Sequence, residues 1–531
     1  MNSTPIHQNG EASDGVNDSS INTKKRPLRA GSKLRIEWSK QSSRMTRLGG
    51  LAYFTEFLEL TGLFDDLVFE CPLTYTSNNA PNKRDVLGVM LLSVLSGQTR
   101  YAHMSSLSGG RVDADLLGMK KIPCEDSIRG AMWKLVTQAQ AAQDKSAALL
   151  WLKQSFDRLC SGALKMPWVL DVDVTVKPLY GKQEGAVLGY NPQHPGRPSH
   201  AYHSFWVGHL RLCLEVQVRP GNETAGSHGL GSLLDWFERH PSREWPDFVR
   251  GDIGYGTQKW MLELELLGIA YLFKLKQTRG VKDLVRLSEL QSDWESSLGT
   301  WECCEATLQL SGWTCSRRVV IYRRIHHKKG SKAKVAKALK GPVEANELLQ
   351  LELIEEDAFT YEYAIYVTSL CEPATEIRAL YNPRGDNENC YDELKNQWGW
   401  GGFTLKDLPR SELMARFIAL IYNWWSIYVK LVDEKIAREA ITSRPLFLFH
   451  NAKVSTHQSI CTLVVFCAHV EAERIQRKLE QAARRLKEWA TLTAEQLELK
   501  SVWARIITHI LTHHKTVGSG NSRDPPMITN L

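Results

Sequence analysis

The sequence lacks several features that would fix its class at once. None of its 11 cysteines forms a CxxC pair or part of a regular framework, so a disulfide-stapled secreted domain is excluded and reduced thiols in a cytoplasm are expected. Cys303, Cys304 and Cys315 lie close together, but their spacing is poor for zinc and no histidine completes the set. No run of about 18 apolar residues occurs, and the polar N-terminus does not resemble a signal peptide. We therefore expect no membrane span.

A strong excess of charge of one sign is also absent. The net charge is +7 over 531 residues, a mildly basic balance that permits a polyanionic partner without requiring one. An apolar fraction of 43%, with 17 tryptophans, is sufficient to form buried cores. This length predicts three or four domains, and no internal repeat is found.

The N-terminal part is predicted to be a polar leader. Residues 1–35 begin rich in Ser, Asn, Gly and Asp, which predicts disorder, and they end in a basic stretch. Between Lys24 and Arg47 nine cations face a single acid, Glu37. This stretch is either an arm that precedes a DNA-binding region or a merely solvated leader.

Residues 36–165 are predicted to form a helical region. Leu51, Phe54 and Leu58 recur at helical spacing before a glycine. The segment Pro123–Met132 predicts a turn and a helix that exposes Arg129, as in the second half of a helix-turn-helix. Small helical domains contain such turns for other reasons too, so groove recognition by Arg129 is a hypothesis.

The pattern changes at Trp168, where strand-like alternation begins. In Val169–Val176 the side chains of Asp171, Asp173 and Thr175 share one face. Further strands are predicted over His203–Leu210, Leu212–Val218, Phe248–Arg250 and Tyr271–Leu275, and helices over Leu230–Glu238 and Gln258–Leu267. The predicted order is three strands, a helix, a strand, a helix and a strand.

The chain after this region divides into three parts. Residues 279–378 contain short alternating runs typical of strands and a basic stretch that includes Lys328 and Lys329. Residues 379–432 are predicted to be helical, and residues 433–531 are predicted to be further helices with a loose tail.

The stretch Tyr381–Lys395 holds Tyr381, Arg384, Glu388 and Lys395 at relative positions 0, 3, 7 and 14. At about 100° per residue these offsets return to one helix face, and Asn382 with Pro383 is a plausible N-cap and first turn. A carboxylate can hold a divalent metal, and arginine and lysine can hold phosphates. The alternative is a solvated, charged helix face.

Each acid also has a simpler explanation. Asp252, in the sequence Arg250-Gly251-Asp252-Ile253-Gly254-Tyr255, could only cap the following helix, and Asp171 and Asp173 could only form an exposed strand face.

The combination of these motifs resembles bacterial insertion-sequence DDE transposases. The resemblance rests on the Tyr-(2)-Arg-(3)-Glu-(6)-Lys order, the Asp-x-Asp-x-Thr strand and the Gly-Asp-x-Gly-Tyr strand end. The stretches Tyr180–Ala186, Gly189–Pro192 and Gly196–Ser199 also look like one subfamily of these enzymes. The similarity covers about Leu51 to Trp425.

The resemblance implies an α/β fold with a ribonuclease-H-like core. The core would occupy residues 166–278 and 379–432, with residues 279–378 as a β-rich insertion before the glutamate helix. Asp173, Asp252 and Glu388 would be catalytic and hold two Mg²⁺ ions, for which Mn²⁺ can substitute, and Asp171 is the alternative to Asp173 as first acid. The expected DNA contacts are Tyr381, Arg384, Lys395, Arg129, Arg197, Lys328 and Lys329, and one of Trp294, Trp301 and Trp313 could stack on a flipped base.

The implied function is DNA transposition. The enzyme would bind terminal inverted repeats, nick one strand with water and use the freed 3′ hydroxyl for hairpin formation and strand transfer into target DNA. A homodimer in the synaptic complex and a bacterial, nucleoid-associated location are expected. The alternatives are a metal-dependent nuclease on the same core and a DNA-binding derivative without activity.

Overall fold

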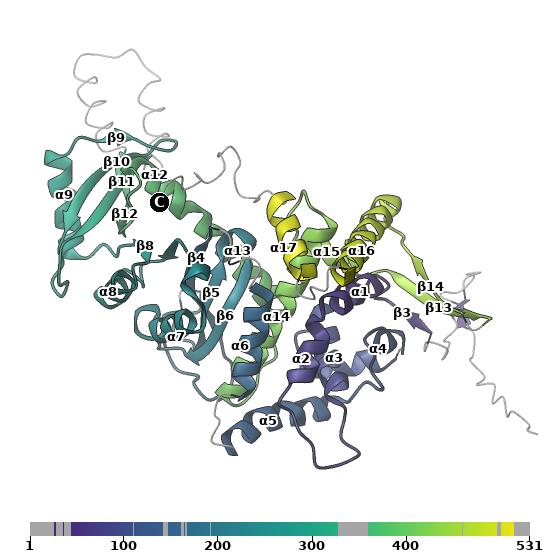
Figure 1. Cartoon of the computed structure of the whole chain (residues 1–531). Helices are drawn as coiled ribbons and strands as arrows, with labels where there is room; N and C mark the ends of the chain where they lie inside the picture. The colour runs from purple at the N-terminus through teal and green to yellow at the C-terminus, as the bar shows by residue number, and fades with distance from the viewer. Residues whose placement is uncertain are drawn as a thin grey trace, which may run out of the picture.

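The fold is described from a computed structural model. It describes residues 26–27, 35–36, 44–109, 111–141, 147–160, 164, 167–191, 193–327, 359–458, 460–495 and 501–513. A nine-stranded mixed sheet extends from the upper left to the centre of Figure 1, and a group of helices lies to its right. Most of the predicted leader, residues 1–35, and both Lys328 and Lys329 lie outside the described residues.

Five strands form the central part of the sheet, in the order β6-β5-β4-β7-β8. Their bounds are β4 (Val169–Pro178), β5 (Ser199–Val207), β6 (Leu212–Pro220), β7 (Phe248–Gly251) and β8 (Ala270–Lys274). β4 pairs antiparallel with β5 and parallel with β7, while β5–β6 is antiparallel and β7–β8 is parallel. Only β5 therefore opposes the direction of the other four strands.

Two helices connect the last three of these strands in chain order. Helix α7 (Ala225–Arg239) connects β6 with β7, and helix α8 (Gln258–Leu266) connects β7 with β8. The predicted order of strands and helices is confirmed. Helix α7 begins five residues before its predicted start at Leu230. Strand β5 begins at Ser199 and ends at Val207, and Gly208–Leu210 forms a 3₁₀ turn instead of extending the strand.

The predicted β-rich block continues the same sheet beyond β8. Its strands are β9 (Glu295–Ser296), β10 (Glu302–Leu308), β11 (Arg317–His327) and β12 (Phe359–Thr368), preceded by α9 (Arg279–Gln291). β12 pairs antiparallel with β8, and β11, β10 and β9 follow outward. Helix α12 (Ala374–Tyr381) covers this part, and Ile377 and Tyr381 join its buried cluster.

The helical N-terminal region was predicted correctly in type. It comprises α1 (Leu51–Thr61), α2 (Leu63–Glu70), α3 (Lys83–Leu95), the 3₁₀ helix η1 (Tyr101–Gly109), α4 (Val112–Leu116), α5 (Glu125–Ala141) and α6 (Ala147–Cys160). Gly62 ends α1 in the left-handed conformation, with φ of 68°, which favours glycine. The apolar side chains of Leu51, Phe54 and Leu58 are buried as their spacing predicts.

Helix α14 (Leu408–Val432) connects the sheet with the helices, and Trp424 and Trp425 on it are buried. It packs on β6 and also against α3 and α6. From the other end of the chain, α15 (Ala440–Phe447), α16 (Ala472–Glu495) and α17 (Ser501–His513) lie beside it, and α16 and α17 contact α1 (Figure 1). The two ends of the described chain thus share one core.

The prediction of helices and a loose tail over residues 433–531 was wrong for residues 451–466. A hairpin of β13 (Asn451–His457) and β14 (Ile460–Phe466) lies within this range, and β3 (Met45–Thr46) pairs with β13. β-Branched residues in β14, such as Ile460, Val464 and Val465, favour a strand because their χ1 freedom is restricted in helices.

No helix within the described ranges is both long enough and apolar enough to cross a membrane.

Candidate active site

The two strand acids of the candidate site come from adjacent parallel strands. β4 and β7 pair with Asp171 opposite Arg250 and Val172 opposite Gly251. On both strands the residue that follows this pair is an aspartate. It is Asp173 within β4 and Asp252 directly after the end of β7. The register therefore brings two carboxylates that are distant in sequence to the same place, where β7 ends.

Asp173 is the more buried acid of the pair, with 9% of the residue exposed. Burial raises the pKa of Asp173 to about 6, Arg384 and the Val174 backbone N–H lower it, and the carboxylates of Asp252 and Asp171 raise it. The guanidinium of Arg384 lies 2.8 Å from Asp173 Oδ2. A cation thus already occupies one oxygen of this carboxylate.

Asp171 has a different environment, although it lies on the same strand face. Its two oxygens accept hydrogen bonds from Arg250, at 2.5 Å from Nε and 2.7 Å from Nη2. Both side chains are buried, and a Cβ on Gly208 would lie 2.2 Å from Asp171 Oδ2, so glycine is required there. Arg250 occupies Asp171 fully, which favours Asp173 as the acid available for chemistry.

The helix that carries the four-residue motif begins differently from the prediction. Tyr381 is the last residue of α12, Asn382–Arg384 form a 3₁₀ turn, and α13 runs over Gly385–Asn396. The predicted N-cap at Asn382 was wrong, because Asn382 has helical φ and ψ. Pro383 cannot donate a helical hydrogen bond, which accounts for a change of helix type at this point.

Three members of the motif lie toward the strand acids. Tyr381 is buried, its ring is 4.5 Å from that of Tyr366, and burial raises its pKa. Burial opposes the charge of Arg384, but Asp173 outweighs it and the pKa of Arg384 is raised. Lys395 is half-buried, which lowers its pKa, while Asp392 and Asp173 raise it.

Glu388 is the member that does not join this group. Its side chain is exposed, although it lies one helical turn after Arg384, whose side chain is buried against Asp173. Within the described ranges no three His, Cys, Asp or Glu side chains are grouped closely enough to hold a metal ion. The predicted convergence of Asp173, Asp252 and Glu388 is therefore seen for the two strand acids only.

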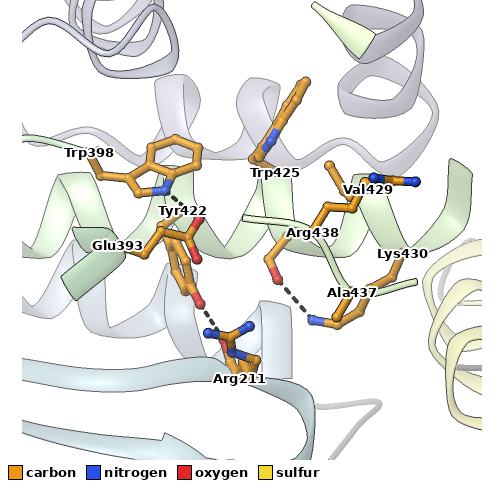
Figure 2. A pocket seen from close by; sticks show the side chains of 10 residues that line it. Arg211, Glu393, Trp398, Tyr422, Trp425, Val429, Lys430, Ala437 and Arg438 are labelled. Carbon is orange, nitrogen blue, oxygen red and sulfur yellow. Dashed lines mark hydrogen bonds between the residues drawn. The ribbon is translucent and has the colours of Figure 1, made fainter. Parts of the chain in front are cut away.

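The orientation of α13 is fixed from its opposite side, where a small pocket lies between α13 and α14 (Figure 2). Glu393 Oε1 accepts hydrogen bonds from Trp398 Nε1 at 3.0 Å and from the Ala440 N–H at 2.9 Å. Cys390 Sγ lies 3.3 Å from Arg211 Nε. These contacts hold one face of α13 against the body, so the face of Arg384 and Lys395 is presented to β4.

The remaining predicted DNA contacts are spread over the surface. Arg129 lies on α5, where it pairs with Glu125 at 2.6 Å and its guanidinium carbon is 4.6 Å from the ring centroid of Tyr101. Arg197 lies 4.3 Å from the ring centroid of Tyr180. Their roles on DNA stay predictions, as do those of Lys328 and Lys329, which the structure does not describe.

The three candidate tryptophans differ in exposure. Trp301 and Trp313 are buried, and the guanidinium carbons of Arg324 and Arg378 lie 4.7 Å and 4.1 Å from the Trp301 ring centroid. Trp294 is partly buried beneath Arg323. This packing favours structural roles over base stacking for Trp301 and Trp313.

Sequence reasoning did not identify Arg250 as part of the site. Besides Asp171, Arg250 Nη1 donates to the carbonyl of Leu380, the residue before Tyr381. The sequence did contain a signal for this role. Arg250 lies in the short apolar strand β7, two residues before Asp252, and an arginine that is buried there needs an anionic partner.

Comparisons with known proteins identify the family of the chain. The family model described as "Transposase DDE domain group 1" matches residues 29–487. The chain belongs to this family of transposases. No curated protein matches it. Among solved structures, a piggyBac transposase synaptic complex with hairpin DNA, determined by cryo-EM, is similar with a TM-score of 0.38 and 9% identity over 90% of this chain and 88% of the other.

Proposed function

We propose that this protein is a DNA transposase that cuts the ends of its own element and joins them to target DNA. The observation that carries the proposal is the placement of Asp173 and Asp252 side by side, on β4 and directly after the adjacent parallel strand β7, with Arg384 and Lys395 on the same side. Paired carboxylates suit divalent cations, and the neighbouring cations suit phosphates. Membership of the family supports the reaction class.

We propose in addition that the core is ribonuclease-H-like. The strand order β6-β5-β4-β7-β8, in which only β5 is reversed, supports this. The strands β9–β12, added at the β8 edge, would be the insertion, and α13 would be the closing helix.

The donor chemistry of the site fits divalent metal ions. Asp173 and Asp252 are carboxylates, and Asp173 already binds a cationic group. Asp173 and Asp252 would hold two Mg²⁺ ions, or Mn²⁺ in their place, with Glu388 as a third ligand once its side chain faces β4. Such ions, when bound, activate the attacking oxygen and stabilise the leaving oxygen.

The chain's own residues would position the DNA. Arg384 would exchange Asp173 for a backbone phosphate, which arginine binds with two hydrogen bonds, and Lys395 would contact a second phosphate as a single charge. Water would attack the phosphodiester at an inverted repeat, and the freed 3′ hydroxyl would then form a hairpin or attack target DNA. A homodimer would hold two ends together, in the nucleoid of a bacterial cell.

The test uses DNA that carries the ends of the element. Purified protein with Mg²⁺ should nick at both ends, yield hairpins and join the ends to a target plasmid. Asp252→Asn should abolish all three products. Asp247→Asn is the matched control, because Asp247 lies just before β7 and Asp252 just after it. Nicking without hairpins or joined products would support the nuclease alternative, and binding without any cleavage would support the silent derivative.

A further inference from the structure

The loop between β4 and β5 is an exposed aromatic surface that the proposed reaction does not use. Tyr180 and Tyr190 are 76% and 81% exposed, and Leu188 between them is 62% exposed. An exposed aromatic ring forgoes the favourable free energy of burial unless a partner covers it, so two on one loop indicate a binding surface.

The loop backbone is fixed to the protein body. Leu179 N–H donates to the Pro198 carbonyl at 2.9 Å, and Glu184 N–H donates to the Lys406 carbonyl at 2.8 Å. A Cβ on Gly189 would lie 1.7 Å from the carbonyl oxygen of Gly221, so the loop can approach β6 only with glycine there. The loop backbone that carries the two tyrosines is therefore held in place before any partner binds.

The charges of the loop favour an anionic partner. The Arg197 guanidinium carbon lies 4.3 Å from the Tyr180 ring centroid, and Tyr180 nevertheless stays largely exposed. Lys182 is exposed as well. Glu184 is exposed too, but its Oε2 accepts the N–H of Leu408 at the start of α14, at 3.0 Å, so the two cations outnumber one acid that is already hydrogen-bonded.

We propose that Tyr180 and Tyr190 stack on unpaired nucleotides of the DNA substrate while Arg197 and Lys182 contact its backbone. Flat rings beside cations are the arrangement that binds single strands without reading sequence. This inference rests on the proposed function, because it assumes a DNA substrate whose cut ends are partly single-stranded.

The position of the loop sets where the contact occurs. β4 continues beyond Asp173 to Pro178, so the loop begins about 16 Å farther along the strand direction. An unpaired strand that kept the rise of duplex DNA, about 3.4 Å per nucleotide, would place the stacking about five nucleotides from the reacting phosphate, and a more extended strand would place it nearer.

The test compares two DNA probes on one protein. The probes are a blunt duplex of the element's end and the same duplex with a six-nucleotide single-stranded extension that contains 2-aminopurine. Binding is measured in the Asp252→Asn background without metal, so that no cleavage occurs. Tyr180→Leu with Tyr190→Leu should bind the extended probe about 5- to 100-fold more weakly, leave blunt-duplex binding within about twofold, and lose 2-aminopurine quenching.

Matched variants separate stacking from other roles. Tyr180→Phe with Tyr190→Phe should retain binding and quenching, because the rings remain. Phe69→Leu, which removes an 86% exposed ring on α2, should change neither probe. Equal losses on both probes, or no loss, would overturn the inference. Loss of self-association in sedimentation experiments without loss of extended-probe binding would also overturn it, in favour of a protein interface. If the parent protein bound neither probe, the proposed function itself would fail.

Discussion

Arg250 and Asp171 form a buried ion pair on the paired strands β7 and β4, two residues before Asp252 and Asp173. Two hydrogen bonds, of 2.5 Å and 2.7 Å, join them across the parallel strands β4 and β7. The same guanidinium donates to the Leu380 carbonyl in α12. The Arg250 side chain therefore connects both acid-bearing strands with α12, the helix that precedes Arg384. These contacts oppose the electrostatic repulsion between the carboxylates of Asp173 and Asp252.

Breaking this pair should cost stability as well as activity. Arg250→Met leaves Asp171 as an unpaired buried charge, and we expect a loss of about 3–5 kcal/mol in the free energy of unfolding. Arg250→Met with Asp171→Leu should recover much of that loss, since no buried charge remains, while cleavage stays impaired. Urea denaturation and end-cleavage assays measure the two effects. Asp252→Asn is the contrast, because it should abolish cleavage with little change in stability. Equal stability of Arg250→Met and the parent would contradict a structural role for the pair.

Glu388→Gln should abolish cleavage in Mg²⁺ and leave binding to the element's ends nearly intact. The amide keeps the shape of the side chain but loses the charge that binds a metal. Because Glu388 is exposed, the fold should tolerate the change. Gel-shift and cleavage assays on the same protein separate the two properties. Cleavage at the parental rate by purified Glu388→Gln would show that another residue is the third acid.

Arg384→Met should strengthen divalent-metal binding by the free protein while it weakens cleavage. Arg384 holds Asp173 Oδ2 at 2.8 Å, so a metal must displace a cation. We expect roughly tenfold tighter Mn²⁺ binding in calorimetry without DNA, about 1.4 kcal/mol. Arg378→Met is the control, since Arg378 contacts Trp301 instead of the acids. Unchanged or weaker Mn²⁺ binding in Arg384→Met would argue against this competition.

Lys430, in the pocket of Figure 2, should make stability depend on pH. Burial, with Arg211 next, lowers the pKa of Lys430 to about 7, and its Nζ donates to the Leu210 carbonyl at 2.6 Å and to Ser426 Oγ at 2.8 Å. Between pH 7 and about 10 the unfolded chain binds the proton that the folded chain releases, so stability rises with pH in this window. Tm should therefore increase from pH 7 to pH 9 by at least about 2 °C more in the parent than in Lys430→Met. Parallel Tm profiles would contradict the lowered pKa.

The basic stretch that includes Lys328 and Lys329 should bind the phosphates of the DNA backbone without sequence specificity. Neutralising Lys328, Lys329, Lys332 and Lys334 together should weaken binding to specific and random duplexes alike. The slope of log affinity against log salt should become shallower by up to about 0.9 for each phosphate that these lysines no longer neutralise. An unchanged slope would instead indicate a loop that only keeps the protein soluble.

The secondary structure around the site could be predicted because its signals are local. Alternation over Val169–Val176 and the glycine after Thr61 fix a strand and a helix end by backbone and side-chain preferences alone, and both are confirmed. The hairpin of β13 and β14 escaped prediction although its strands are longer than β7 and β8, because β13 pairs with β3, which lies about 400 residues away and leaves no local signal in the sequence.

The sequence by itself determined the order of strands and helices in the core, and its motifs predicted Asp173, Asp252 and Glu388 as the catalytic acids. It could not decide between Asp171 and Asp173, because alternation puts both on one strand face. The tertiary structure gives the two acids different partners, with Arg250 on the neighbouring strand opposite Asp171 and Arg384 against Asp173, which favours Asp173. Helical periodicity likewise grouped Glu388 with Arg384. In the tertiary structure Arg384 is buried and Glu388 is exposed. The reason is that Arg384, packed against β4, neutralises the buried carboxylate of Asp173, whereas Glu388 would add a second negative charge there and stays in solvent.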